Sequence, residues 1–209
     1  VEINLWNKIK AMALKGRRTG LGITAEGDML AALGLRYGSE KALKFAVEVH
    51  KTLAVEAYRA SVLMARDRGA FEVFDAEKEK NNPMINRLRE ADSSLYEDML
   101  KYGRRNIAML TIAPTGTTSL MSQTTSGIEP VFRPVYKRRR KINPSDKNFV
   151  ATFVDEQGNA FEEYNVYHHK FIDWLTINGY DTSRLQTISD EELEKWVAAS
   201  PYNRATAND

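Results

Sequence analysis

Residues 106–132, NIAMLTIAPTGTTSLMSQTTSGIEPVF, contain the pattern that decides the expected fold. The stretch opens with an apolar run, residues 107–112, in which Thr111 is the single polar side chain. Such a run predicts a strand that is buried on both faces. Ala113 and Pro114 end this strand, because proline has no N–H group to donate to a neighbouring strand. Glycine and hydroxyl residues follow, so the pattern predicts a strand, a tight turn and the start of a helix.

The predicted turn consists of Pro114, Thr115, Gly116, Thr117, Thr118 and Ser119. Backbone N–H groups in the first turn of a helix have no partner inside the helix and lie at the positive end of its dipole. With hydroxyl groups beside them they form an anion site, for which phosphate is the most natural ligand. The turn has no lysine, so it differs from the Walker phosphate loop. A helix capped by Thr115 or Thr117, without any ligand, is the alternative that the turn alone leaves open.

Longer runs of the chain resemble the catalytic (large) subunit of ribonucleotide reductase, above all the adenosylcobalamin-dependent class II enzymes. The resemblance rests on PTGTTSL, SGIEPVF and RPVYKRRRKINP in residues 114–144, on RRTGLGITAEGDMLAALGL in residues 17–35, and on EEYNVYHHKF and SPYNRATAND in residues 162–171 and 200–209. It implies an α/β fold that is part of the family's ten-stranded α/β barrel, with a β-hairpin insertion near residues 148–166. Residues 1–209 are then expected to form a single unit, a fragment of the barrel domain.

The family reduces ribonucleotides to deoxyribonucleotides by a radical mechanism, and the resemblance gives this chain a share in substrate binding. Residues 114–119 match the turn that holds the substrate's phosphates in the family. The N–H groups of Thr117, Thr118 and Ser119 are expected to donate to phosphate oxygens, while Thr115 and Gly116 let the backbone approach them. Class I enzymes carry a charged residue at the position of Gly116, which favours the cobalamin class. The resemblance places no catalytic residue of the family in this chain.

The chain contains no cysteine. Because family enzymes use a cysteine thiyl radical and further cysteine pairs, the chain alone is expected to be inactive as a reductase. It begins with Val1 and stops where family members continue, so we expect a fragment of a longer enzyme. The implied partners are a nucleoside di- or triphosphate substrate, the remainder of the reductase chain and a thioredoxin-like reductant. The implied cofactor of the full-length enzyme is adenosylcobalamin, with a class I radical subunit that carries a metal cofactor as the alternative; none is expected on the fragment itself.

Composition excludes several classes of protein. With 209 residues, 43 % of them hydrophobic, and a net charge of +2, the chain can form a substantial core and has no overall affinity for polyanions. No apolar run approaches the roughly 18 residues of a membrane helix, and the N-terminus does not resemble a secretory signal. A cytoplasmic protein without a membrane partner is therefore expected.

Five consecutive cations, KRRRK in residues 137–141, allow three interpretations. They form a solvated charged segment, a nucleotide phosphate site or a nucleic-acid contact. A nucleic-acid partner is not expected, because no aromatic residues interleave the run. The alternative function for the whole chain is a stand-alone nucleotide- or RNA-binding module without catalysis. A structural relic that stabilises a partner subunit is a third hypothesis.

Periodicity and capping residues also predict most of the secondary structure. Helices are expected over residues 1–14, 25–33, 39–68, 83–90, 94–102, 167–177 and 189–198, and extended chain over residues 17–24, 131–141, 149–154 and 160–166. Ser94 with Glu97, and Ser189 with Glu192, form the predicted capping boxes. Residues 71–82 are expected to be irregular.

Sequence context also gives expectations for five further residues. Gly20 and Gly22 mark a close approach of the backbone by a ligand or by a neighbouring element, and close packing in a barrel wall is the favoured interpretation. Glu129, in the SGIEP run, is expected to be a buried carboxylate that anchors its loop. No metal site is expected, because the adjacent residues His168 and His169 point to different faces of the predicted helix.

Overall fold

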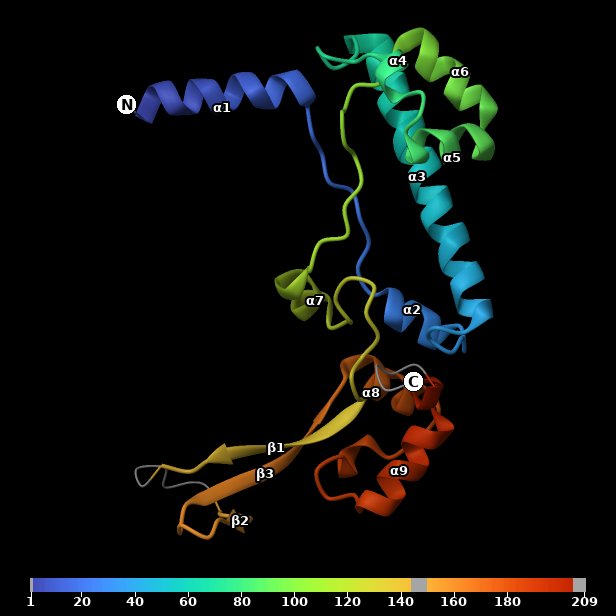
Figure 1. Ribbon diagram of the computed structural model, residues 1–209. Coiled ribbons are helices and arrows are strands. Elements are labelled where there is room, and N and C mark those ends of the chain that lie inside the picture. Colours follow the sequence, from blue (N-terminus) through green and yellow to red (C-terminus); the bar gives the residue numbers. More distant parts are fainter. Residues whose placement is uncertain (1, 144–149, 205–209) are drawn as a thin grey trace. The chain divides into compact units, whose positions relative to one another are not determined.

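The computed structural model describes residues 2–143 and 150–204 (Figure 1). Contacts divide the chain into two compact units. The first holds Val1–Ile23 and Leu43–Ala113, and the second holds Thr24–Ala42 and Pro114–Asp209. That residues 1–209 form one domain stays a prediction. Residues 148 and 149 of the expected hairpin insertion, and residues 205–209 of the C-terminal resemblance, lie outside the described residues.

The first unit is built from helices. They are α1 (Glu2–Gly16), α3 (Glu40–Arg68), whose first residues belong to the second unit, α4 (Ala76–Glu79), α5 (Pro83–Ala91) and α6 (Ser93–Tyr102). The prediction of an irregular segment was wrong at α4, because the Asp75 carboxylate accepts two backbone hydrogen bonds and caps this short helix. The predicted cap of α6 was also wrong. Asp92, not Ser94, accepts from the N–H of Leu95 over 2.9 Å.

Residues 107–112, the expected buried strand, form only an isolated parallel bridge, between Leu21 and Leu110. The segments that follow α1 and α6 run side by side in Figure 1. The Leu21 N–H donates to the Met109 carbonyl over 2.7 Å, and the Thr111 N–H donates to the Leu21 carbonyl over 2.9 Å. Met109 alone is buried in this run. The prediction of burial on both faces was wrong: residues 107, 108 and 110 are half-buried and residues 111 and 112 are exposed, because the described chain does not cover both side-chain faces of this run.

The predicted close approach at Gly20 and Gly22 is confirmed. A Cβ atom on Gly20 would lie 2.7 Å from the Thr111 Cγ2 atom, and a Cβ atom on Gly22 would overlap the Thr111 carbonyl oxygen. The missing side chains therefore let the two segments pair.

The core of the first unit lies between α3, α5 and α6. Its buried residues are Tyr58, Val62, Ile85, Leu88, Leu95, Met99 and Met109. Arg104 is 3 % exposed beside this core and forms an ion pair with Glu79. Its guanidinium also donates to the Asn106 carbonyl over 3.1 Å and lies over the ring of Phe71. The buried charge is thus paired and hydrogen-bonded, as burial requires.

The second unit combines helices with a small sheet. Its elements are α2 (Glu26–Ala32), α7 (Gly116–Ser122), α8 (His169–Ile177), α9 (Asp190–Ala199), the 3₁₀ helices η1 (Thr182–Arg184) and η2 (Pro201–Arg204), and the strands β1 (Val135–Lys141), β2 (Phe153–Val154) and β3 (Ala160–Tyr167). The strands pair antiparallel in the order β1-β3-β2, with Lys141 and Phe153 both opposite Phe161. The predicted hairpin is confirmed for the described residues. The described sheet has three strands, so a ten-stranded barrel is not confirmed.

The core of the second unit combines aliphatic with aromatic side chains and lies between α2, α8, α9 and η2. Its buried residues are Ala31, Phe171, Leu175, Ile188, Leu193, Trp196 and Tyr202. The predicted N-cap of α9 is confirmed, because the Ser189 hydroxyl accepts from the N–H of Glu192 over 3.3 Å.

Among the helices that the structure describes, none has the length and apolar character needed to cross a membrane.

Candidate functional site

The turn singled out in the sequence leads directly into α7, which begins at Gly116. Within the described residues, the N–H groups of Gly116, Thr117 and Thr118 donate to no partner, and all three residues are exposed. The N–H of Ser119 already donates to the Thr115 carbonyl over 2.8 Å, and its hydroxyl donates to the Gly116 carbonyl over 2.9 Å. Three adjacent backbone donors therefore face solvent at the start of α7, where an anion is favoured.

Thr115, the N-cap residue of α7, has a left-handed backbone with φ 45° and ψ 29°. A β-branched residue rarely adopts this conformation, which costs on the order of 1 to 3 kcal/mol. The Thr115 side chain makes no capping bond to its own helix. Its hydroxyl is instead used to hold the turn against two other segments of the second unit.

A series of hydrogen bonds joins these segments. We call it the threonine relay, and it passes through Gly127, Thr115, Thr24 and Thr125. The Gly127 N–H donates to Thr115 Oγ1 over 3.0 Å, the Thr115 and Thr24 hydroxyls are 3.0 Å apart, and the Thr24 hydroxyl donates to the Thr125 carbonyl over 3.2 Å. A hydroxyl has one hydrogen to donate. Because Thr24 donates to Thr125, Thr115 must be the donor to Thr24, and the direction of the whole relay is fixed.

The SGIEP run lies against the start of α2. The Glu26 N–H donates to the Gly127 carbonyl over 3.4 Å, and a Cβ atom on Gly27 would lie 2.6 Å from both the Glu129 carbonyl oxygen and the Pro130 Cα atom. Glu129 itself is exposed. The prediction of a buried anchoring carboxylate was therefore wrong, because the backbone of the loop, and not this side chain, makes the close contact with α2.

Four further residues of the second unit, three of them buried and one half-buried, form a hydrogen-bonded group that we call the Asp28 cluster. It consists of Asp28, Thr125, His168 and Tyr202. Asp28 Oδ1 lies 2.7 Å from His168 Nε2 and accepts from the Tyr202 hydroxyl over 2.7 Å, while Oδ2 accepts from the Thr125 N–H over 2.8 Å. An ionised carboxylate only accepts hydrogen bonds, so His168 Nε2 carries the hydrogen. The cluster joins α2, the loop before β1, the start of α8, and η2.

The hydrogen bonds of the cluster determine how its groups titrate. Burial by itself raises the pKa of Asp28, but the bonds from His168, Tyr202 and the Thr125 N–H outweigh it and hold this pKa below its usual value of 3.8. Burial, and then the hydrogen bond to the Asp28 carboxylate, raise the pKa of Tyr202. Asp28 therefore stays ionised and Tyr202 stays protonated near neutral pH.

The six predicted turn residues form one loop and helix start, in which Pro114, Gly116, Thr117 and Thr118 are exposed, Thr115 is half-buried and Ser119 is buried. Sequence reasoning missed the Asp28 cluster and the role of Thr24, because their partners lie far away along the chain. One local signal was present. Asp28 lies in the first turn of α2, where acidic residues are favoured by the helix dipole.

The basic run forms β1, and most of its charges have acidic partners. Lys137 pairs with Asp190 over 2.7 Å, Arg140 pairs with Glu162 over 3.2 Å, and Arg139 pairs with Glu163 on the neighbouring strand. These pairs are consistent with a solvated charged strand. They leave fewer cations for a polyanion than the sequence suggested.

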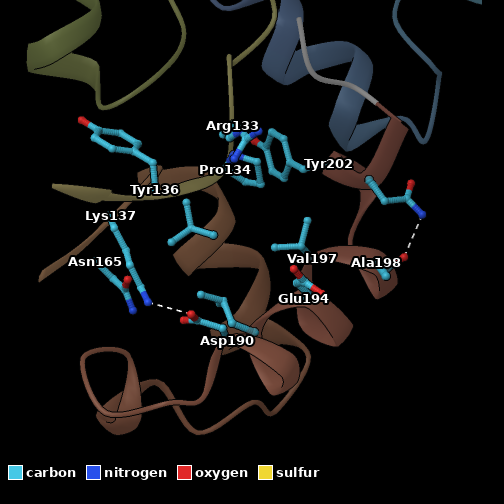
Figure 2. A pocket seen from close by; sticks show the side chains of 13 residues that line it. Arg133, Pro134, Tyr136, Lys137, Asn165, Asp190, Glu194, Val197, Ala198 and Tyr202 are labelled. Atoms are coloured by element: carbon cyan, nitrogen blue, oxygen red, sulfur yellow. Dashed lines mark hydrogen bonds and ion pairs between the residues drawn. The ribbon is translucent and has the colours of Figure 1, made fainter. Parts of the chain in front are cut away.

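A hollow of about 530 Å³ lies between β1 and α9, with the Lys137–Asp190 ion pair on one side and Tyr202 on the other (Figure 2). Two basic residues, Arg133 and Lys137, and two acidic ones, Asp190 and Glu194, line it. Their charges balance, so this hollow gives no preference for an anion. No group of three histidine or acidic side chains suited to a metal ion occurs in the described part of the chain.

Comparison with known proteins agrees with the resemblance in the sequence. Residues 2–205 match the family model described as "Ribonucleotide reductase, barrel domain". The chain is 35 % identical over 123 residues to the vitamin B12-dependent ribonucleoside-diphosphate reductase of Mycobacterium tuberculosis, covering 58 % of this chain and 15 % of that protein. It is 31 % identical over 190 residues to the protein of the same name from Thermoplasma acidophilum, covering 90 % of this chain and 21 % of that protein.

A third relative is named differently. The ribonucleoside-diphosphate reductase subunit alpha of Treponema pallidum is 27 % identical over 128 residues, which cover 60 % of this chain and 15 % of that protein. The chain thus spans between 15 % and 21 % of the length of these three relatives.

Proposed function

Because this chain belongs to the ribonucleotide reductase barrel-domain family, we propose that it supplies the turn that holds the substrate's phosphates in a ribonucleotide reductase catalytic subunit. One observation supports this proposal above all. The three adjacent N–H groups of Gly116, Thr117 and Thr118 are exposed and have no partner among the described residues. Such donors at the start of a helix suit phosphate oxygens.

The share of this chain in the reaction is to position the substrate. The unpaired N–H groups donate to phosphate oxygens, and the exposed hydroxyls of Thr117 and Thr118 add two further donors. Ser119 supports the turn from inside in the present geometry, and its direct contact with phosphate stays a prediction. Binding of the phosphates fixes the position of the ribose. The ribose and the reacting groups of the enzyme then meet without a further loss of translational and rotational entropy.

The reaction of the whole enzyme is the reduction of a ribonucleotide to a deoxyribonucleotide by a radical mechanism. The relatives' names specify ribonucleoside diphosphates, which favours a diphosphate as the substrate of this protein too. The chain has no cysteine, so the thiol chemistry of the family belongs to other parts of the enzyme. A thioredoxin-like reductant would regenerate those thiols.

We also propose that the full enzyme uses adenosylcobalamin, because relatives above 30 % identity are named as vitamin B12-dependent. The described residues do not fit this group by themselves. Hollows within the two units have volumes of about 530, 670 and 750 Å³, the size that drug-sized ligands occupy, whereas adenosylcobalamin is much larger. A cobalamin site therefore requires other parts of the protein.

Substitution of Gly116 by valine tests the phosphate site. A Cβ atom on Gly116 meets nothing within 4 Å, so Gly116→Val leaves the ligand-free turn intact and places methyl groups where the anion would lie. We expect the affinity of the full protein for a ribonucleoside diphosphate, measured by titration calorimetry, to fall about tenfold or more, since a hydrogen bond to a charged group contributes roughly 1.5 to 3 kcal/mol. Unchanged affinity would contradict the proposal.

The matched control is Ser93→Val, which places the same side chain at the first position of another helix, α6. This variant should bind the nucleotide like the wild type.

A stand-alone RNA-binding module is not favoured, because three of the five cations of β1 have acidic partners. Strong, steeply salt-dependent binding of single-stranded RNA would revive that alternative.

A further inference from the structure

The Asp28 cluster is buried, charged and unused by the function proposed above. Asp28 is 7 % exposed, Thr125 8 % and Tyr202 3 %. A buried carboxylate is stable only when its hydrogen bonds are complete, so such a cluster fixes the relative positions of the segments that contribute to it. These segments include the loop that carries Thr125 and Gly127, next to the turn.

A continuous series of hydrogen bonds connects the cluster to the turn. Asp28 and Thr125 exchange two bonds, from the Thr125 N–H to Oδ2 and from the Asp28 N–H to Thr125 Oγ1 over 3.3 Å. The Thr125 carbonyl then accepts from Thr24, which accepts from Thr115. The cluster and the threonine relay thus share Thr125, and the relay includes Thr115, the residue before the three N–H groups that have no partner among the described residues.

We propose that Asp28, His168 and Tyr202 are positioning residues for the anion-binding turn, acting through Thr125 and the threonine relay. This inference rests on the proposed phosphate site. Thr115 holds a left-handed backbone that a threonine would leave if its hydroxyl lost its partners. By fixing Thr125, the cluster fixes Thr24 and then Thr115, and so sets the direction in which the N–H groups of residues 116–118 point.

Removal of one hydroxyl from the cluster tests the proposal. Tyr202→Phe keeps the ring, which packs edge-on against Phe171 and His168, and removes only the bond to Asp28. The matched control is Tyr167→Phe. Its hydroxyl donates to the Leu185 carbonyl in the same unit, but it has no described bond to the cluster or the relay.

Both variants are made in the full protein, with the affinity for a ribonucleoside diphosphate and the melting temperature as readouts. We expect Tyr202→Phe to weaken nucleotide affinity about 2- to 30-fold, the usual range for coupling through a packed network. Tyr167→Phe should leave the affinity unchanged even where it lowers the melting temperature. Equal losses of affinity in both variants would mean a general structural role and would overturn the inference.

A double-mutant cycle adds a readout that loss of stability does not produce. Tyr202 and Thr24 act on the same turn through one path. The fold-loss of nucleotide affinity in the double variant Tyr202→Phe with Thr24→Val should therefore be smaller than the product of the fold-losses in the two single variants. Independent effects would overturn the inference.

Gly116→Val separates this inference from the proposed function. If Gly116→Val weakens binding and Tyr202→Phe does not, the positioning role is wrong and the phosphate site stands. If neither variant changes the affinity, the phosphate site is wrong, and the positioning role falls with it.

Discussion

Asp28 and Thr125 exchange two hydrogen bonds across 97 residues of sequence: each backbone N–H donates to a side-chain oxygen of the other residue. This arrangement is that of a capping box, except that its two halves come from different segments. The N-cap residue of α2, Ala25, has no side-chain oxygen and a left-handed backbone with φ 66°. Thr125 therefore provides the cap that the local sequence of α2 lacks.

The first prediction concerns this cap. Thr125→Val keeps the shape of the side chain but leaves the buried N–H of Asp28 without an acceptor. We expect the free energy of unfolding to fall by about 1 to 2 kcal/mol, as for the loss of other helix caps. Thr125→Ser retains the hydroxyl, so its loss in the free energy of unfolding should be less than half of that in Thr125→Val. Denaturant unfolding of the two variants measures the difference, and equal losses would show that the methyl group and not the hydroxyl matters.

The second prediction concerns pH. The pKa of Asp28 in the folded protein lies below its usual value of 3.8, although burial opposes this shift. A carboxyl group with a lowered pKa stabilises the fold at pH values above its unfolded pKa, and this contribution is lost as the pH falls through the folded pKa. The melting temperature of Asp28→Asn should therefore lie furthest below that of the wild type above about pH 4, and the gap should narrow in more acidic solution.

The control for the pH experiment is Asp98→Asn, at an exposed aspartate of α6. We expect this variant to follow the wild type across the pH range. If the difference in melting temperature between Asp28→Asn and the wild type stays constant down to pH 2, ionisation of Asp28 does not stabilise the fold.

The third prediction concerns the strained N-cap residue of α7. Thr115→Val removes the hydroxyl that accepts from the Gly127 N–H and donates to Thr24. Because Gly127 is buried, its unpaired N–H should lower the free energy of unfolding by roughly 1 to 3 kcal/mol. Thr115→Ser should remain close to the wild type. Thermal unfolding of both variants measures this, and a stable Thr115→Val protein would argue against the relay.

The fourth prediction tests the parallel pairing in the first unit. Gly22→Ala would drive a methyl group into the Thr111 carbonyl oxygen, so the two segments must separate. We expect a loss of roughly 3 kcal/mol or more in the free energy of unfolding, at the upper end of single substitutions. The control, Gly116→Ala, adds the same methyl group in open space and should change stability by less than about 0.5 kcal/mol.

The sequence predicted the features that depend on neighbours along the chain. Helices with apolar residues every three or four positions, such as α3, α5 and α9, lie within a few residues of their predicted bounds. The hairpin was predictable from its turn residues, where Asp155 accepts from the N–H groups of Gln157 and Asn159. The start of α7 at Gly116 followed from Pro114 before it and from the glycine and hydroxyl residues of the turn itself. Each of these features is fixed by residues a few positions apart.

Features that depend on distant residues were not predictable in the same way. Asp28 meets His168 and Tyr202 across 140 and 174 residues, and no spacing in the sequence marks such a pairing. The burial of residues 107–112 depends on how many neighbours the segment has, which an apolar run does not specify. At α6, Asp92 and Ser94 both carry a side-chain oxygen that can accept from the first backbone N–H groups of the helix. Asp92 became the cap in place of Ser94, and Ser94 donates its hydroxyl to the Asp92 carboxylate over 2.8 Å.

β1 lies at the edge of the three-stranded sheet, and its charged side chains therefore affect how the protein meets other extended chains. An edge strand offers unpaired backbone groups to any other extended chain, and this is a common route to aggregation. Because side chains alternate along a strand, KRRRK places cations on both faces of β1. Two copies of this edge that approached each other would bring like charges together on both sides. We therefore expect replacement of Arg138 and Arg140 by threonine to promote self-association of the protein, seen as light scattering that rises with concentration.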